Sequence, residues 1–575
     1  MKKTSLKLLS ILMLVFFATL QSCDKDEPNT PNTPPPDDET YVYDKGAAKT
    51  ADFMGQIVDE NGNAMSGVAV SIGSQSVATD ANGVFFINNA NVYKNLAFVK
   101  AEKAGYFLGS RSLVPTNGVN NVKIMMLQKQ QIGSFDAATG GSVSGNGITI
   151  NFQDGVVDAN GNAYTGNVNV AAKYIDPESD NFADYMPGNL IAADADGNRY
   201  LESYGMVAVE LTDGSGNELQ PAEGKDATVS FPLSSGLLAD APSTIALWHF
   251  SETGGYWVYE GTATLEGGVY KAQVSHFSFW NCDIPTDNAI LDGQLVDANN
   301  TGLSNVRVRV VSANFGSRSD FTSSTGHFGG IVPANDNLTL EIFLDCGGGE
   351  VLIHTENVGA ISSNTTLSPI VINSTGISVN VSGTLVDCNY GAVGNGYVID
   401  NSGRVCVVSS GAFNFVSCAN TSIGLKGFDL DNFNESGVNN YTLGISDLNV
   451  GQLVACNSIS EYIQWNIDGT DYVATGTVNL SSQGTYGEIF GSTPDNINVS
   501  IYPFNGVGTY IIDGSNQSYL WGSAPLDSIV NSNITVDITQ YGANSGDLVE
   551  GTINGTFDQG GSSSTISGTI HFFVD

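Results

Sequence analysis

The sequence predicts an all-β protein made of tandem Ig-like β-sandwich modules behind a disordered N-terminal tether. Short runs of alternating apolar and polar residues recur along the chain, as in 68–72 and 306–310, and turns rich in Asn, Asp and Gly separate them. After the first 22 residues, no extended stretch has apolar residues at helical period. This pattern is typical of β-sandwiches, and a chain of 575 residues is long enough for several of them.

The N-terminus predicts export and a lipid anchor. Three lysines lie within the first seven residues, and an apolar stretch from Leu8 to Leu20 follows them. This stretch is shorter than the roughly 20 residues that span a bilayer, and it fits the core of a secretory signal. The next residues, LQSC at 20–23, resemble the lipobox of bacterial lipoproteins. The resemblance implies that residues 1–22 are removed and that the Cys23 thiol is diacylated; the alternatives are an ordinary signal peptide and an uncleaved anchor.

Residues 23–49 predict a disordered tether behind the first sandwich. They are rich in proline, polar residues and acids, a composition that cannot bury a core. The acidic run at 24–27 resembles the export tag of surface lipoproteins in Bacteroidetes-type bacteria. That resemblance implies an outer-membrane protein, lipid-anchored through Cys23 and displayed at the cell surface.

The net charge excludes nucleic acid as a partner. Without the signal, the chain has 59 acidic against 18 basic residues, a net charge of −41. Binding to phosphates requires a basic surface, which this chain lacks. An acidic membrane surface would also repel it, so the acyl chains at Cys23 are expected to be its only membrane contact.

Three internal repeats begin at Gly55, Gly293 and Gly383 with the pattern Gly-x-ϕ-ϕ-Asp, where ϕ is apolar. The pattern describes a strand that runs into a turn, in which Asp accepts hydrogen bonds from its own backbone. Downstream of the first copy, TDANGVF at 79–85 predicts a tight turn that starts a strand carrying an aromatic residue. The repeats resemble the carboxypeptidase regulatory-like domain, a transthyretin-like sandwich. This implies scaffold modules without catalytic residues at 50–130, 287–374 and, in divergent form, 375–457.

The other two predicted modules are different. Residues 131–286 contain PG, DADG, SYG, WHF and HFSFWN in this order. These landmarks resemble the extracellular β-domain of cartilage intermediate layer protein and of the astroprincin family, which implies a structural or adhesive role. Residues 458–575 end in two alternating strands around a Gly/Ser-rich loop and predict a further β-sandwich of no recognised family.

Six cysteines remain after Cys23, and an even number in an exported chain indicates disulfides. We expect at least one bond within the third repeat, and proximity to predicted strand ends favours three of its four cysteines over Cys406. Cys282 and Cys346 either pair across modules or stay buried. The disulfide candidates are Cys388, Cys406, Cys418 and Cys456.

No catalytic site, cofactor or metal centre is predicted. None of the five histidines lies in an HExxH or HxH motif, and neither a GxSxG nor a Walker-type sequence occurs. The turns at 59–63, 158–162 and 194–198 contain part of a calcium-loop pattern, but their glycine is misplaced and the distal Glu is missing. Turns capped by Asp side chains explain them without an ion, and calcium is the alternative.

Alternating aromatic residues around Trp257 are expected to pack in the core, since every second side chain of a strand points inward. An exposed Trp257 would instead form part of a sugar-binding platform. Together these features predict a non-catalytic, lipid-anchored surface scaffold or adhesin that binds an extracellular matrix protein or a glycan. A polysaccharide-binding accessory lipoprotein is the second hypothesis, and a surface hydrolase with a pair of carboxylates is the third.

Overall fold

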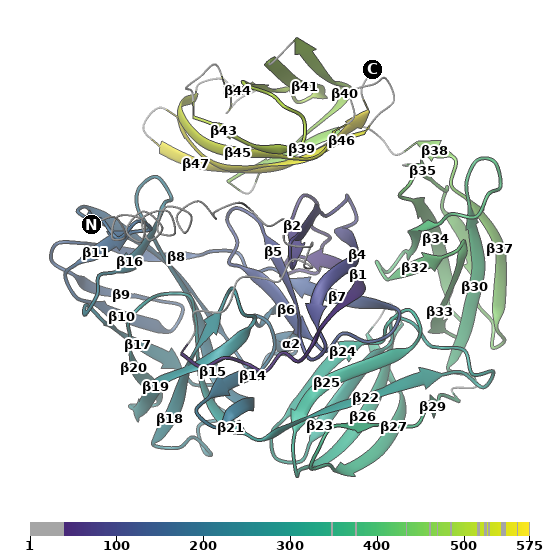
Figure 1. Ribbon diagram of the computed structural model, residues 1–575, viewed down its shortest axis with the longest axis horizontal. Coiled ribbons are helices and arrows are strands. Elements are labelled where there is room, and N and C mark those ends of the chain that lie inside the picture. The colour runs from purple at the N-terminus through teal and green to yellow at the C-terminus, as the bar shows by residue number, and fades with distance from the viewer. Residues whose placement is uncertain are drawn as a thin grey trace, which may run out of the picture. The chain divides into compact units, whose positions relative to one another are not determined.

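The alternating segments form mostly antiparallel sheets in the computed structural model, so the prediction of an all-β protein is confirmed (Figure 1). The structure describes residues 40–573 apart from 347–348, 374–375, 433, 459–461, 469, 484–485, 514–517, 523–525, 527–528, 542–547 and 560–561. Within these ranges the strands form seven sheets, and the helix α2 (Phe182–Tyr185) is four residues long. No helix of the described part has the length and apolar composition that crossing a membrane requires.

The first repeat is a two-sheet sandwich. β1 pairs with β4 antiparallel and with β7 parallel, while the second sheet has the order β3-β2-β5-β6. Its inner faces bury Phe53, Ile57, Val70, Phe85 and Val99. The strands are β1 (Ala48–Val58), β2 (Ala69–Ile72), β3 (Gln75–Ala78), β4 (Val84–Tyr93), β5 (Ala97–Glu102), β6 (Gly109–Leu113) and β7 (Val119–Met125).

The predicted tether is wrong at its C-terminal end. Tyr43 is buried, and its ring lies 5.6 Å from that of Tyr256. The backbone N–H of Asp44 donates to Asn198 Oδ1 at 2.8 Å. Because Tyr41 and Tyr43 supply apolar rings between the polar tract and β1, this stretch packs instead of remaining free. Cys23 and the rest of the tether lie outside the described residues.

Residues 131–286 form one sheet of 14 strands, and the four-residue helix lies between β13 and β14 in the sequence. Its core contains Val170, Val209, Phe231, Leu247 and Trp280. The strands are β8 (Gln131–Asp136), β9 (Gly141–Gly145), β10 (Ile148–Phe152), β11 (Val156–Asp158), β12 (Ala163–Tyr164), β13 (Asn167–Ile175), β14 (Ile191–Asp194), β15 (Gly197–Thr212), β16 (Glu218–Pro221), β17 (Ala227–Pro232), β18 (Thr244–Ser251), β19 (Tyr256–Glu266), β20 (Val269–Val274) and β21 (Phe279–Thr286).

The second repeat has the strand pairing of the first. β22 pairs with β25 antiparallel and with β28 and β29 parallel, and the facing sheet has the order β24-β23-β26-β27. The strands are β22 (Asn288–Val296), β23 (Arg307–Ser312), β24 (Ser317–Phe321), β25 (His327–Pro333), β26 (Asn337–Asp345), β27 (Glu350–Ala360), β28 (Thr365–Thr366) and β29 (Ile370–Val371).

The third repeat keeps the same central pairing, with β30 antiparallel to β33 and parallel to β37, within a sheet of nine strands. The strands are β30 (Ser378–Val386), β31 (Asn395–Asp400), β32 (Val405–Ser409), β33 (Ala412–Cys418), β34 (Ser422–Asp429), β35 (Asn434–Glu435), β36 (Asn439–Thr442), β37 (Leu448–Val454) and β38 (Asn457–Ser458).

One contact explains the repeated glycine. Gly55 lies opposite Phe85 in the register, and a Cβ on Gly55 would lie 2.4 Å from the Phe85 ring. Gly293 lies in the same way opposite Phe328 in the second repeat, and the third repeat pairs Gly383 with Phe413. The glycine therefore leaves room for the aromatic ring of its cross-strand partner.

The C-terminal strands form a nine-stranded sheet in the order β43-β45-β46-β47-β39-β40-β41-β42-β44, drawn in yellow-green in Figure 1. The sheet encloses its own core, in which Ile489 and Val499 join Val536, Val549 and Ile570. The strands are β39 (Tyr462–Ile467), β40 (Thr470–Gln483), β41 (Tyr486–Pro494), β42 (Ile497–Ile501), β43 (Gly508–Ile512), β44 (Tyr519–Gly522), β45 (Ile529–Tyr541), β46 (Leu548–Gln559) and β47 (Ser562–Phe573).

Candidate functional site

An edge of the C-terminal sheet presents aromatic side chains beside polar groups. β44 is the edge strand and pairs with β42, which pairs in turn with β41. In this register Asn498 lies between Trp521 and Phe490, and Ser500 lies opposite Tyr519. Side chains at alternate positions of a strand share one face of the sheet. These five residues therefore lie on one surface, which we call the aromatic face.

The two aromatic residues of β44 are open to solvent. Trp521 is 49% exposed and Tyr519 is 43% exposed, whereas Leu520 between them points into the core. Exposing two large aromatic side chains on a four-residue strand gains nothing for packing. Neighbouring exposed apolar groups commonly mark a binding surface, and Tyr and Trp are enriched there because each combines an apolar ring with a polar atom.

Polar groups beside these rings are held by hydrogen bonds. The Tyr486 hydroxyl donates to Ser500 Oγ at 3.0 Å and lies 3.4 Å from the Tyr519 hydroxyl. Asn498 Nδ2 donates to Glu488 Oε1 at 2.5 Å. Asn498 and Ser500 are buried beneath the face, so their positions are set by packing.

The chemistry of the aromatic face suits a sugar ring. An exposed aromatic ring can stack on the C–H face of a pyranose, and the neighbouring hydroxyls of Tyr486 and Tyr519 can bond the sugar hydroxyls. Residues 458–575 contain acids but neither Lys nor Arg. This module would therefore repel an anionic polymer, and the face fits a neutral glycan. Sequence analysis missed it, although the alternation Tyr519-Leu520-Trp521 between turn residues was a readable signal.

Trp257 does not form a platform. Its side chain is 0% exposed, and its Nε1 donates to the Asn189 carbonyl at 3.0 Å. The Phe250 ring packs against it edge-on at 5.2 Å. The structure thus removes Trp257 from the possible ligand surface, because its strand turns this side chain into the core.

The six cysteines of the described residues form two disulfides. Cys388 is bonded to Cys456 within the third repeat, and Cys418 is bonded to Cys346 of the second repeat. The sequence left open whether Cys346 pairs across modules or stays buried, and its bond crosses the boundary between two predicted modules. Cys406 is a buried free thiol that packs in the core of the third repeat, so naming it a disulfide candidate was wrong. Cys282 is also free and buried.

In the three turns with part of a calcium-loop pattern, the first Asp side chain accepts hydrogen bonds from its own turn. Asp59 Oδ1 accepts hydrogen bonds from the backbone N–H groups of Asn61 and Asn63, both at 2.8 Å. Asp158 accepts equivalent bonds from its own turn, and the Asn162 side chain lowers the pKa of Asp158. In the third turn the Asp196 N–H donates to Asp194 Oδ1 at 2.8 Å. This geometry is that of Asx turns.

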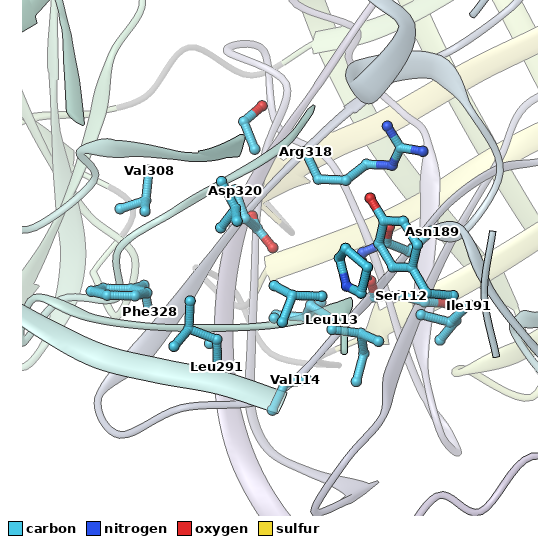
Figure 2. A pocket seen from close by; sticks show the side chains of 18 of the residues that line it. Ser112, Leu113, Val114, Asn189, Ile191, Leu291, Val308, Arg318, Asp320 and Phe328 are labelled. Atoms are coloured by element: carbon cyan, nitrogen blue, oxygen red, sulfur yellow. Dashed lines mark hydrogen bonds between the residues drawn. The ribbon is translucent and has the colours of Figure 1, made fainter. Parts of the chain in front are cut away.

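A small cavity lies among β6, β14, β22 and β25 (Figure 2). Leu113, Leu291 and Phe328 line it together with the polar side chains of Asn189 and Arg318. Its volume of about 60 Å³ has room for a few water molecules.

Two larger grooves, of about 430 and 480 Å³, both reach Arg307. Its guanidinium pairs with Glu350 at 2.6 Å and with Asp184 at 3.6 Å. In the larger groove Arg309 pairs with Glu341 at 2.6 Å. These arginines are bound to acids of the same chain, which is the arrangement of a structural ion-pair network.

Two histidines that no sequence motif connects meet in the 14-stranded sheet. His249 and His276 both approach the carboxylate of Glu260, and these three residues could hold a metal ion. Their convergence depends on how β18, β19 and β20 pair. Local sequence therefore carried no signal for it.

Comparisons with known proteins identify no family. No family model matches the chain, and no curated protein matches it. A streptococcal ancillary pilin is 12% identical, covering 38% of this chain and 95% of its own at a TM-score of 0.14. The Bacillus anthracis TIE protein is 10% identical, with coverages of 64% and 71% and a TM-score of 0.14. The major pilin subunit of Bacillus cereus, BcpA, is 12% identical, with coverages of 57% and 100% and a TM-score of 0.12. Similarity at this level establishes neither a family nor a function.

Proposed function

We propose that this chain is a non-catalytic cell-surface binding protein whose C-terminal sheet binds a neutral glycan. Its tandem β-sandwiches act as a scaffold, and Cys23 anchors it to the outer membrane. The observation that carries the proposal is the exposure of Trp521 and Tyr519 on one face, next to the buried polar groups of Asn498 and Ser500. The lipobox and the binding face lie at opposite ends of the sequence, an order that suits display away from a membrane.

The arrangement of titratable groups supports binding rather than turnover. Catalysis requires groups with shifted pKa values gathered in a pocket that also holds the substrate. The Trp521 and Tyr519 rings of the aromatic face are open to solvent, and the carboxylate beside them, Glu488, is hydrogen-bonded to Asn498. A glycosidase would need two carboxyl groups flanking the bond that is cleaved.

An extracellular matrix protein is the second candidate partner. β44 is an edge strand, and an extended segment of another protein can add to such an edge through its backbone. The two candidates differ in what they require. Glycan binding depends on the two exposed rings, whereas strand addition depends on the β44 backbone.

The test measures binding of the purified chain to an array of neutral polysaccharides and matrix proteins. Trp521→Ala and Tyr519→Ala should each weaken glycan binding at least tenfold, which corresponds to about 1.4 kcal/mol. Tyr390→Ala is the matched control, because Tyr390 is 69% exposed in the third repeat. This control should bind the glycan as tightly as the unmodified chain.

Three outcomes would overturn the proposal. In the first, neither ring variant lowers the affinity for a bound glycan. In the second, the chain binds a matrix protein and no glycan. In the third, the chain turns over a glycoside, peptide or ester, and one Asp, Glu or His substitution abolishes this activity.

A further inference from the structure

Three ligand-type side chains converge between neighbouring strands of the 14-stranded sheet. His249 lies on β18, Glu260 on β19, and His276 in the turn that follows β20. Glu260 Oε2 lies 2.7 Å from His249 Nδ1 and 3.4 Å from His276 Nε2. The three ligand atoms all lie within 4.8 Å of one another.

A break in the register between β18 and β19 positions the carboxylate of Glu260. Leu247 of β18 pairs with Gly261, while its neighbour Trp248 pairs with Tyr259. Glu260 is therefore the extra residue of a β-bulge. A bulge redirects a side chain away from regular alternation and is enriched beside functional sites. Here it brings Glu260 to the same side as His249.

Neighbouring groups orient the ligands. Ser275 Oγ donates to Glu260 Oε1 at 2.9 Å, which leaves Oε2 directed at the two imidazoles. The buried Trp280 donates from Nε1 to the His276 carbonyl at 3.0 Å. Its ring lies 4.9 Å from the His276 ring and 5.8 Å from the His249 ring. Such second-layer contacts set the orientation of ligands in metal sites.

We propose that His249, Glu260 and His276 bind a divalent transition metal, with Zn²⁺ as the best-fitting ion. Two imidazole nitrogens and one carboxylate oxygen are a ligand set of zinc sites that keep a fourth, open position. Metal–ligand bonds of 2.0–2.1 Å in a tetrahedron separate the ligand atoms by about 3.3 Å. The 3.4 Å separation of Glu260 Oε2 from His276 Nε2 matches that value, and the 2.7 Å separation from His249 Nδ1 would have to widen by about 0.6 Å when the ion binds.

The alternative is a hydrogen-bonded cluster without metal. A carboxylate that only oriented His249 would need one imidazole, yet two approach the same oxygen atom. The side chains of His276 and Glu260 are 37% and 31% exposed, so an ion can reach the cluster from solvent. The open fourth position would then hold water or a donor atom of a partner.

The experiment titrates the purified, metal-free chain with Zn²⁺ by calorimetry and with Co²⁺ by visible absorption. One ion should bind per chain, and Co²⁺ should give the intense visible bands of a four-coordinate site. His276→Gln and Glu260→Gln should each weaken Zn²⁺ binding at least tenfold and reduce the Co²⁺ bands. His354→Gln is the matched control, because His354 lies 3.4 Å from Glu356 on β27 and belongs to no group of three ligands among the residues that the structure describes.

Circular dichroism of each variant verifies folding, and His276 is chosen because its partial exposure makes the substitution tolerable. Equal Zn²⁺ affinity in the unmodified chain and in folded His276→Gln or Glu260→Gln would overturn the proposal. Failure of the unmodified chain to bind Zn²⁺ or Co²⁺ would also overturn it. Trp521→Ala should leave metal binding unchanged, which keeps this inference independent of glycan binding.

Discussion

At the level of single residues, the Cys388–Cys456 bond ties together two parallel strands. Val386 of β30 pairs with Val454 of β37, and each cysteine lies two residues beyond its member of that pair. The bond therefore closes a loop of 68 residues at the point where pairing ends. A cross-link over a loop of this length restricts the unfolded chain strongly.

Replacing both cysteines, as Cys388→Ala with Cys456→Ala, should lower the free energy of unfolding by about 4 kcal/mol. Urea denaturation measures the loss. Cys406→Ala is the control, since it removes a buried thiol but no bond and should cost only about 1 kcal/mol. Thiol counting on the unfolded, unreduced and lipidated chain should detect Cys282 and Cys406. Detection of additional thiols would contradict the pairing.

At the level of elements, the first two repeats share a buried threonine whose hydroxyl is hydrogen-bonded to two backbone groups. Thr79 Oγ1 donates to the Met65 carbonyl at 2.6 Å and accepts from the Val68 N–H at 2.9 Å. Thr322 Oγ1 donates to the Leu303 carbonyl at 2.5 Å in the second repeat and accepts from the Val306 backbone there. One hydroxyl thus satisfies two backbone groups that irregular pairing would leave without partners.

Thr79→Val keeps the shape of the side chain but leaves a buried donor and a buried acceptor unsatisfied. We expect it to lower the free energy of unfolding by about 1–3 kcal/mol, measured as a lower urea midpoint. Thr79→Ser should retain most of the stability, and the exposed Ser76→Ala should change it by less than about 0.5 kcal/mol. A Thr79→Val chain as stable as the parent would show that the hydroxyl contributes nothing.

At the level of the whole molecule, the net charge bears on the proposed anchor. Without residues 1–22, the chain has 59 acidic and 18 basic residues, and this charge would repel anionic surfaces and other copies of the chain. Attachment to a membrane would then have to come from the hydrophobic burial of acyl chains, each CH₂ contributing about 0.8 kcal/mol. The proposed anchor at Cys23 supplies this attachment.

Cys23→Ser should therefore remove the chain from the membrane fraction or leave it as a precursor that retains residues 1–22. Detergent phase partitioning and intact mass measure the two outcomes, and digestion of whole cells by external protease tests surface display. Cys282→Ala is the control and should remain anchored, because this thiol is buried in the folded chain. An unmodified Cys23 in the membrane-bound protein would refute the lipid anchor.

The strands and repeats could be predicted because their signals are local. Alternation of apolar residues sets which face of a strand is buried, and Asp59 and Gly83 supply the conformations of their own turns. The sequence also indicated the contact of Gly55 with Phe85, since a glycine and a phenylalanine recur at the equivalent positions of every repeat. Composition alone was insufficient for residues 40–47, where two tyrosines pack a segment that otherwise looks like a tether.

By itself the sequence determined the strand content, the repeated units and the charge, because each depends on residues that are neighbours along the chain. Only the tertiary structure decided that Trp257 is buried while Trp521 is exposed, since this depends on whether a strand is central or at an edge. It likewise decided the Cys346–Cys418 bond and the meeting of two histidines at one carboxylate. The physical reason is that strand pairing and register bring distant residues together, and a shift of one residue would turn every one of these side chains to the opposite face.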